Sequence, residues 1–300
     1  MLIGLLTLLG LATAIILIAY ITIVCWEVVH PERRTAGWAL AHGMPTTPED
    51  FDLPYEEWTV DRPDGTRLPV WDIPADPIEA GTAEDAPTVI VIHGWSRSRI
   101  DSLVRVQQLL VDPNGARRRF RTILPDLRGH GDASEGRTTL GSSEVGDLEA
   151  ILDTLGEGPF ILVGHSLGAV LALHLAGRRS ERIRSVLAIA PYDRLATPFD
   201  GYLRSRDFPA GPFSRMLEHT LRLCGIRMRD TNEIAAGLSM PIEVMVGSED
   251  RVCPPSVARR ITASAQRAQC HELPDTGHSN HHVRGPQDFR RLFERCLEAE

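Results

Sequence analysis

The sequence contains no lysine, and all 32 of its basic residues are arginines. Together with frequent alanine, glycine, proline and aspartate, this bias is typical of a GC-rich genome and indicates no special demand for guanidinium groups. Acidic residues number 40, so the formal net charge is −8. Because nucleic acids are polyanions, this charge argues against nonspecific nucleic-acid binding.

Cysteine is scarce and scattered. The cysteines are odd in number and form no Cys-x-x-Cys pair, so the sequence predicts neither a disulfide framework nor a zinc site. With 300 residues, 43% of them apolar, the chain is long enough to fold around a sizeable core without cross-links. The five cysteines are Cys25, Cys224, Cys253, Cys270 and Cys296.

Charged side chains are missing from residues 1–26. A bilayer core needs about 20 apolar residues in a helix, and this segment supplies them. Tyr20 and Trp26 lie near its end, where the aromatic belts of membrane helices are found. We therefore expect residues 1–26 to form a single-pass transmembrane anchor that attaches the protein to a membrane.

Two other interpretations of this segment fit less well. A cleaved signal peptide would begin with positive residues and have an apolar region of about 7–15 residues, whereas here no basic residue precedes a longer apolar run. A buried core helix would carry polar residues on one face. Arg33 and Arg34 follow the span, so the positive-inside rule places the rest of the chain in the cytoplasm.

Residues 27–54 are expected to form a linker, and the globular domain to begin at Tyr55. The runs 57–60 and 67–73, with Pro63-Asp64-Gly65 between them, predict a β-hairpin. After a polar loop at 75–86, strands alternate with helices, which predicts an α/β fold with a doubly wound, mostly parallel sheet. Strands are expected at 88–92, 120–124, 159–163, 183–190, 241–246 and 268–273, and helices at 100–111, 143–155, 170–176, 257–265 and 287–297.

Residues 192–239 interrupt this alternation, because they contain no convincing strand. They include several aromatic residues and an amphipathic segment around Leu217. We expect a helical cap above the carboxyl ends of the strands, inserted between a first part of the core, 55–191, and a second part, 240–300. The aromatic residues are Phe199, Tyr202, Phe208 and Phe213.

The motif Gly-x-Ser-x-Gly occurs at residues 164–168, between an apolar run and a run of helix formers. A strand, a tight turn and a helix in this order form a nucleophile elbow, in which the serine hydroxyl is exposed at the end of the strand. Glycines are needed on both sides because the turn leaves no room for a side chain. Ser166 is therefore the candidate nucleophile.

A serine hydroxyl needs a base to take its proton and a third group to orient that base. Loops at the carboxyl ends of parallel strands meet in one crevice. Asp250 follows the predicted strand 241–246, and His278 follows the predicted strand 268–273. The chain order Ser166, Asp250, His278 is the order that a nucleophile-elbow hydrolase requires. We predict that Asp250 orients His278.

Other polar residues near these loops have competing interpretations. Glu249 is an alternative to Asp250, and Asp275 is too close to His278 along one loop. His165 lies inside the elbow and cannot act as base on its neighbour, so we assign it to packing or specificity. His271 lies within a strand, where we expect a core or surface histidine.

A metal site is the remaining alternative. His281 and His282 lie near His278, but no paired carboxylates accompany them, so we expect no metal and no cofactor.

The oxyanion of an acyl-transfer reaction also needs donors. The backbone N–H of Leu167, at the start of the helix after Ser166, is one candidate. The other is expected from the loop that follows His93-Gly94, at Trp95. A polar cluster in the next loop, at Asp126, Arg128, His130 and Asp132, is interpreted as structural.

These motifs resemble the α/β-hydrolase superfamily over about residues 57–297. The stretch 139–147 is similar to bacterial serine-hydrolase branches with monoacylglycerol-lipase-like, lysophospholipase-like and aminopeptidase-like members. The loop at 132–134 departs slightly from the usual pattern, which affects no catalytic residue. The matching motifs are His93-Gly94-Trp95, Asp126-x-Arg128-Gly129-His130-Gly131, Gly164-His165-Ser166-Leu167-Gly168, Gly247-x-x-Asp250 with Val252 and Pro254-Pro255, and Gly277-His278.

The resemblance implies hydrolysis through an acyl-enzyme, with no cofactor. The leading hypothesis is a membrane-anchored carboxylic ester hydrolase whose substrate is a small-molecule or lipid-like apolar acyl ester. A peptidase or amidase of the same fold is one alternative, and a reaction such as perhydrolysis is another. A non-catalytic binding protein is the third, and the complete set of serine, aspartate and histidine argues against it.

Overall fold

The structure, a computed structural model, describes residues 2–76, 87–110, 119–204, 207 and 210–299. Most of the predicted loop at 75–86 lies outside the described residues. So do Val111, the predicted end of one helix, and Phe208 of the predicted cap.

An eight-stranded sheet forms the centre of the molecule, in the order β1-β2-β4-β3-β5-β6-β7-β8. β2 pairs antiparallel with β1 and with β4, and all other neighbours are parallel. The predicted hairpin is the pair β1 and β2. The mostly parallel α/β class predicted from the sequence is thereby confirmed. The strands are β1 Glu56–Asp61, β2 Arg67–Ile73, β3 Thr88–Ile92, β4 Arg121–Pro125, β5 Phe160–His165, β6 Ile183–Ile189, β7 Ile242–Gly247 and β8 Ala268–Leu273.

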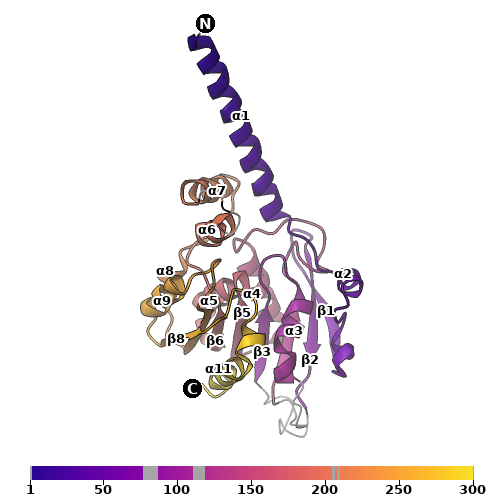
Figure 1. Ribbon diagram of the computed structural model, residues 1–300. Helices are drawn as coiled ribbons and strands as arrows, with labels where there is room; N and C mark the ends of the chain where they lie inside the picture. Colours follow the sequence, from indigo (N-terminus) through magenta and orange to yellow (C-terminus); the bar gives the residue numbers. More distant parts are fainter. Residues whose placement is uncertain (1, 77–86, 111–118, 205–206, 208–209, 300) are drawn as a thin grey trace.

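Helices cover both faces of the sheet (Figure 1). One apolar core lies between the sheet and α4, α5 and α9, and a second lies between the opposite face and α3 and α11. The helices are α1 Leu2–Val29, α2 Ala36–Ala41, α3 Arg99–Leu110, α4 Glu144–Leu155, α5 Leu167–Arg178, α6 Ala196–Arg204, α7 Pro212–Leu223, α8 Thr231–Ala235, α9 Pro255–Ser264, α10 His281–Arg284 and α11 Pro286–Leu297, with short 3₁₀ helices at Pro48–Phe51 and Ser180–Arg182.

The central strands are apolar on both sides because both of their faces are covered. In β3, Ile90 and Ile92 belong to the first core, whereas Val89 and Val91 belong to the second. Successive side chains of a strand point to opposite faces, so a continuous β-branched run is what a doubly covered parallel strand requires. This burial holds the strand ends, and the loops that follow them, in fixed positions.

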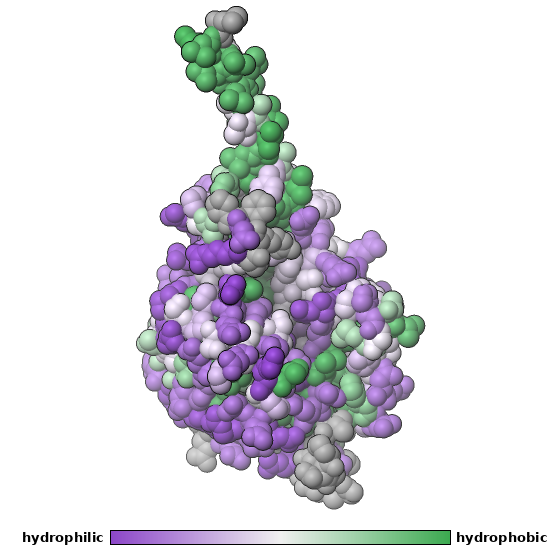
Figure 2. Space-filling model, in the orientation of Figure 1, coloured by the Kyte–Doolittle hydropathy of each residue, from purple (hydrophilic) through white to green (hydrophobic). Residues whose placement is uncertain are grey.

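Helix α1 projects away from the globular part (Figure 1). Among the described helices it alone is long and apolar enough to cross a membrane, and an 18-residue window of it has no buried residue. A signal sequence near the N-terminus can satisfy the same criteria of length and composition. The outer turns of α1 are hydrophobic, whereas most of the visible globular surface is hydrophilic (Figure 2).

The segment predicted as a linker, 27–54, is packed against the globular part. Helix α1 continues to Val29, which is buried and whose carbonyl accepts a 2.9 Å hydrogen bond from the N–H of Thr138. Farther along, Ala39 of α2 and Leu53 are buried in the second core. The sequence did not predict these contacts, because the segment is rich in Pro and Gly and its single apolar residues form no periodic pattern.

The described part of the segment predicted as a cap, residues 192–239, contains the helices α6, α7 and α8, which form two groups. Helices α6 and α7 pack against each other, and α7 also packs against the end of α1. Helix α8 instead packs against α5 and α9, in the layer that covers the sheet. Of these three helices, α6 and α7 are drawn nearest to α1 (Figure 1), and α7 contacts it.

Candidate active site

Ser166 lies in the turn between β5 and α5, at the carboxyl end of a central strand. Its φ of 54° lies in the left-handed region, where a non-glycine residue is strained. The N–H of Ser166 donates to the carbonyl of Ile189 at 2.8 Å, which ties the turn to the neighbouring strand β6. The buried sheet thus holds the serine in a conformation that it would not adopt alone.

Two glycines make this turn possible. A Cβ on Gly168 would lie 2.1 Å from the carbonyl oxygen of Ile92, and one on Gly164 would lie 2.2 Å from the carbonyl oxygen of Gly168. Both obstacles are backbone atoms, which cannot move aside cheaply. The close approach of helix α5 to strand β3 therefore requires glycine at position 168, as the Gly-x-Ser-x-Gly motif predicts.

Ser166, His278 and Asp250 form one hydrogen-bonded chain. The Oγ of Ser166 lies 3.1 Å from Nε2 of His278, and Nδ1 of His278 lies 2.8 Å from Oδ2 of Asp250. In the matching tautomer, Nδ1–H donates to the carboxylate and Nε2 accepts the serine proton. The two partners come from the loops after β8 and β7, at the same edge of the sheet as Ser166.

The carboxylate of Asp250 is held from its other side. Its Oδ1 accepts backbone hydrogen bonds from Val252 at 2.9 Å and from Cys253 at 2.8 Å. Asp250 is 3% exposed, so these bonds and the His278 ring replace its hydration. Glu249 and Asp275, the other acidic residues considered from the sequence, are both exposed, whereas the carboxylate beside His278 is that of Asp250.

His165 supports the loop that carries His278. Its Nε2 donates to the carbonyl of His278 at 2.7 Å, and burial holds the pKa of His165 well below its ordinary value. A neutral ring with the proton on Nε2 is what this contact needs. His271 lies elsewhere, with its Nε2 2.6 Å from Oε2 of Glu243 on the neighbouring strand. No group of metal-ligating side chains occurs among the described residues.

The loop after β3 brings Gly94 and Trp95 to Ser166. His93 anchors this loop, because its Nε2 accepts from the N–H of Leu127 at 3.0 Å while its Nδ1 donates to the carbonyl of Gly94 at 2.8 Å. Burial lowers the pKa of His93 to about 4, which keeps Nε2 free to accept. A Cβ on Gly94 would lie 3.4 Å from the Cβ of Ser166, so this backbone passes close to the serine.

Leu167 begins helix α5. The N–H groups of Ala169 and Val170 donate to the carbonyl of Ser166. The N–H of Leu167 comes earlier, in the first turn, where helical N–H groups have no partner within the helix and where the helix dipole favours negative charge.

The polar loop after β4 is tied to its surroundings. The guanidinium of Arg128 contacts the buried carboxylate of Asp147 twice, at 2.6 and 2.7 Å. Asp126 accepts from the N–H of Arg99 at 2.7 Å and from that of Asp132 at 2.9 Å. Burial lowers the pKa of His130 to about 3. These contacts agree with the structural role interpreted from the sequence.

A cavity of about 590 Å³ lies above Ser166 and His278. Apolar side chains of the cap and the adjoining loops form much of its wall. The same cavity is lined by residues of α1, which sequence reasoning did not place at the site. The apolar lining residues outside α1 include Leu140, Leu195, Phe199, Leu203, Leu217 and Val252.

Two further residues at the site escaped prediction. The thiol of Cys253 is fully buried, and burial raises its pKa well above the ordinary value, while the neighbouring Ser166 hydroxyl opposes that rise. His281 is buried beside His165, with 6.0 Å between ring centroids. Nothing in the spacing of these residues along the chain points to Ser166, because helix α10 and the loop after Asp250 are positioned by packing.

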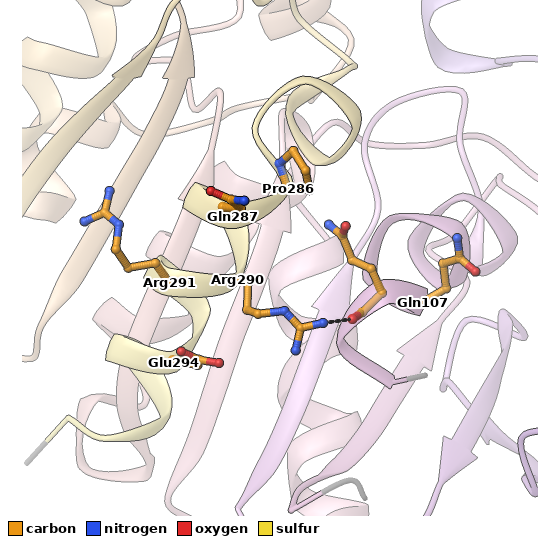
Figure 3. Close-up of a pocket in the computed structure, with 7 residues that line it drawn as sticks. Gln107, Pro286, Gln287, Arg290, Arg291 and Glu294 are labelled. Carbon is orange, nitrogen blue, oxygen red and sulfur yellow. Dashed lines mark hydrogen bonds between the residues drawn. The ribbon is translucent and has the colours of Figure 1, made fainter. Parts of the chain in front are cut away.

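A second hollow lies between α3 and α11 and shares no lining residue with the cavity above Ser166. Figure 3 shows Arg290 reaching from α11 toward α3, where its guanidinium donates to the carbonyl of Gln108. The lining residues are arginines, glutamines, a proline and a glutamate. They include no serine, cysteine or histidine, so this hollow offers no nucleophile.

The sheet order and the two helix layers are those of an α/β hydrolase. The sequence profile of the Alpha/beta hydrolase family matches residues 89–292, more than half of the chain. The chain therefore belongs to this family, as the sequence motifs predicted. The narrower resemblance to monoacylglycerol-lipase-like and related branches stays a prediction.

Several curated relatives cleave esters by name. A pimeloyl-[acyl-carrier protein] methyl ester esterase of Chromobacterium violaceum is 24% identical over 73% of this chain and 97% of its own length. Lipase LipV of Mycobacterium tuberculosis is 34% identical over 28% of this chain, and the match spans only 34% of that lipase. A haloalkane dehalogenase of Mesorhizobium japonicum is 32% identical over 55% of this chain and 48% of its own length.

Solved structures show the same fold. An esterase of Pyrococcus furiosus superposes with a TM-score of 0.67, at 19% identity, over 90% of this chain and 97% of the esterase. A hydrolase of Pseudomonas aeruginosa superposes with a TM-score of 0.61, at 22% identity, over 81% of this chain and 99% of its own. The enzyme class predicted from the sequence, an ester-cleaving α/β hydrolase, agrees with the names of these relatives.

Proposed function

We propose that this protein is a membrane-anchored serine hydrolase that cleaves a carboxylic ester with an apolar acyl group. Ser166 is the nucleophile, His278 the general base and Asp250 the residue that orients the base. The observation that carries the proposal is the continuous chain of hydrogen bonds from Ser166 through His278 to Asp250, 3.1 and 2.8 Å long, at the floor of an apolar cavity.

The reaction follows from the positions of the protons. As Oγ of Ser166 attacks the ester carbonyl carbon, its proton passes to Nε2 of His278, and Asp250 stabilises the imidazolium that forms. The tetrahedral intermediate collapses, the ester C–O bond breaks, and His278 returns the proton to the leaving alcohol. Water then attacks the acyl-enzyme with His278 again as base, which releases the acid and regenerates Ser166.

The oxyanion in this scheme is stabilised by two backbone N–H groups, those of Leu167 and Trp95. Leu167 is at the positive end of helix α5, which favours a developing negative charge. Trp95 belongs to the loop that His93 ties down beside Ser166. Loss of one well-placed donor typically raises the barrier by roughly 3–4 kcal/mol. No cofactor enters the reaction.

An apolar, lipid-like acyl group is favoured by the cavity wall and by the membrane helix. Leucine, valine and aromatic side chains of the cap and adjoining loops surround the space above Ser166, and burial of acyl methylenes against them is favourable by roughly 0.8 kcal/mol each. Helices α6 and α7 act as the cap. The substrate-binding unit is therefore the predicted cap together with the two parts of the core, 55–191 and 240–300.

We propose further that α1 is retained as an anchor. Cleavage as a signal sequence would remove contacts that the globular part makes with the end of this helix. Val29 is buried in the first core, and the carbonyls of Val28 and Val29 accept hydrogen bonds from Trp95 and Thr138. A segment destined for removal would leave these groups without partners.

The cytoplasmic placement of the catalytic domain is a separate proposal, based on Arg33 and Arg34 after the span. A fusion of a reporter that is active only in the periplasm to the C-terminus tests it in a bacterial host. Low reporter activity is expected, and strong activity would refute the cytoplasmic placement.

A fluorophosphonate probe tests the enzymatic proposal. The protein is expected to be labelled and to hydrolyse esters, and Ser166→Ala to lose both properties. Absence of labelling in the parent protein would count against a serine hydrolase and favour a non-catalytic binding protein. Labelling combined with turnover of aminoacyl amides alone would favour a peptidase of the same fold.

A further inference from the structure

We infer that the last turns of α1 form one wall of the substrate site, and that the acyl chain of a lipid reaches Ser166 directly from the bilayer that holds α1. This inference rests on the proposed ester hydrolase function and names its substrate class, an acyl ester resident in the enzyme's own membrane. The anchor is then part of the binding site as well as an attachment.

The position of the lining residues on α1 is the first observation. Tyr20, Ile23, Val24, Glu27 and Val28 all line the cavity that contains Ser166 and His278. Successive positions differ by three, one, three and one, so these residues lie on a single face of the helix. The opposite side of these turns carries Thr22 and Trp26, which are exposed.

The helix is also fastened at this level. Val24, Cys25 and Val28 pack against the first core, and α1 packs against α7 of the cap. The indole N–H of Trp95, next to the proposed oxyanion donor, gives a 2.8 Å hydrogen bond to the carbonyl of Val28. The wall formed by α1 is therefore attached both to the loop that contains Trp95 and to helix α7 of the cap.

The length of α1 indicates that the turns lining the cavity lie at the membrane surface. Its 28 residues extend about 42 Å at 1.5 Å per residue, whereas a bilayer's hydrocarbon core is about 30 Å thick. The surplus of about 12 Å corresponds to roughly two turns. The free outer part of α1 spans the core, and the packed turns that line the cavity lie at the interface, the level favoured by Tyr20 and Trp26.

The rim of the cavity indicates where it opens. Most of its lining residues are buried or half-buried, but four large apolar ones are exposed: Tyr20, Ile23, Trp95 and Tyr202. Ile23 is 57% exposed, although it also faces the cavity. Side chains that belong to both the cavity and the outer surface mark its mouth. These four residues come from α1, from α6 and from the loop after β3, so the mouth lies among these elements.

The other exposed lining residues are Glu27 and Ser279, so large apolar side chains form most of the mouth. Such a mouth beside a membrane-spanning helix opens toward lipid. A fatty acyl chain that moves from the bilayer into this cavity passes from one apolar environment to another and leaves no apolar surface in water. The geometry thus favours an ester whose acyl chain is dissolved in the membrane and whose carbonyl lies at the interface, at the level of Ser166.

The experiment uses the full chain reconstituted in phosphatidylcholine vesicles. One substrate is a fluorogenic palmitoyl ester that partitions into the bilayer, and the other is the soluble p-nitrophenyl acetate. Ile23→Trp narrows the mouth, and Ile16→Trp is its matched control, because Ile16 is exposed on the same helix and lines no part of the cavity. Fluorophosphonate labelling verifies that the two tryptophan variants are folded, and Ser166→Ala gives the background.

Ile23→Trp is expected to lower the ratio of palmitoyl to acetyl kcat/KM by about tenfold, since overfilled apolar sites are costly, and Ile16→Trp to leave it within about twofold. Equal ratios for the two variants would overturn the inference. The parent protein is also expected to hydrolyse palmitoyl ester in its own vesicles far faster than ester supplied in separate vesicles. Equal rates would overturn the inference while leaving the ester hydrolase function intact. Absence of Ser166-dependent turnover of either ester would overturn both.

Discussion

The indole N–H of Trp95 donates a 2.8 Å hydrogen bond to the carbonyl oxygen of Val28. Trp95 belongs to the loop after the central strand β3, and Val28 to the last turn of α1. The bond therefore joins the loop beside Ser166 to the helix that is long and apolar enough to cross a membrane. It fastens a helix end whose final carbonyls have no partner within the helix itself.

Trp95→Phe removes this bond and keeps the aromatic ring and the backbone N–H. We expect a loss of about 0.5–1.5 kcal/mol in stability and a fall of roughly three- to tenfold in kcat/KM for a long-chain ester. Thermal unfolding and turnover in vesicles measure the two effects. Trp26→Phe, at an exposed position of α1, serves as the control and should change kcat/KM by less than about twofold. Similar losses in both variants would contradict a specific role for the Trp95 bond.

Asp250→Asn is expected to lower kcat by roughly 10³–10⁴-fold with little change in KM, because an amide no longer stabilises the imidazolium and favours the wrong tautomer of His278. Steady-state kinetics with a soluble ester measures this effect. Glu249→Gln is the matched control, since Glu249 is adjacent in sequence but exposed. A large loss in the Glu249 variant with a small one in the Asp250 variant would reverse the assignment.

Gly168→Ala is expected to destabilise the fold by at least about 3 kcal/mol. The added Cβ would lie 2.1 Å from the Ile92 carbonyl oxygen and 2.6 Å from that of His93, and both are backbone atoms. Gly37→Ala provides the contrast, because it lies in helix α2 and its nearest contact is 3.8 Å away. That variant should gain roughly 0.5–1 kcal/mol. Chemical unfolding in detergent measures both, and equal stabilities would refute the packing argument.

His281 is expected to make the fold sensitive to acid. Burial lowers its pKa from 6.5 to about 3, and neither ring nitrogen has a hydrogen-bond partner among the described residues. In the unfolded chain His281 takes up a proton near pH 6.5, whereas in the folded protein it stays neutral at that pH. Above pH 6.5 the free energy of unfolding is therefore unaffected by this residue. It declines as the pH falls toward 3, by about 2 kcal/mol at pH 5.

His281→Leu removes this proton and two unpaired nitrogens. Its unfolding free energy should therefore decline less than that of the parent between pH 7 and pH 5, by about 2 kcal/mol. Urea unfolding at the two pH values measures the difference. An unchanged pH dependence would indicate that the folded protein protonates His281 as readily as the unfolded chain does.

Much of the fold could be predicted, because the patterns that indicate its strands and turns lie within short stretches of the sequence. Each β-branched run predicted a strand covered on both faces, and the glycines around Ser166 predicted the tight turn after β5. Parallel strands bring their carboxyl ends to one edge of the sheet, so Ser166, Asp250 and His278 were expected to meet once their strands had been recognised. Their separation along the chain is large, but the topology alone brings them together.

The residues that surround the turn at Ser166 could not be predicted in the same way. Residues 1–26 are apolar on every side, so no periodicity marks the face of α1 that lines the cavity. Its partner α7 begins at Pro212, more than 180 residues after the end of α1 at Val29. His281 and Cys253 lie near Ser166 because short segments pack there, with no motif of their own.

Residue order along the chain was therefore enough to identify the fold and to predict that Ser166, Asp250 and His278 lie together, because regular strands and turns follow from local spacing and composition. The walls of the cavity, the packed segment between α1 and β1, and the bond from Trp95 to Val28 depend on which surfaces come into contact. Contacts between segments far apart in sequence are selected by packing in three dimensions, where many apolar faces compete and local composition does not distinguish among them.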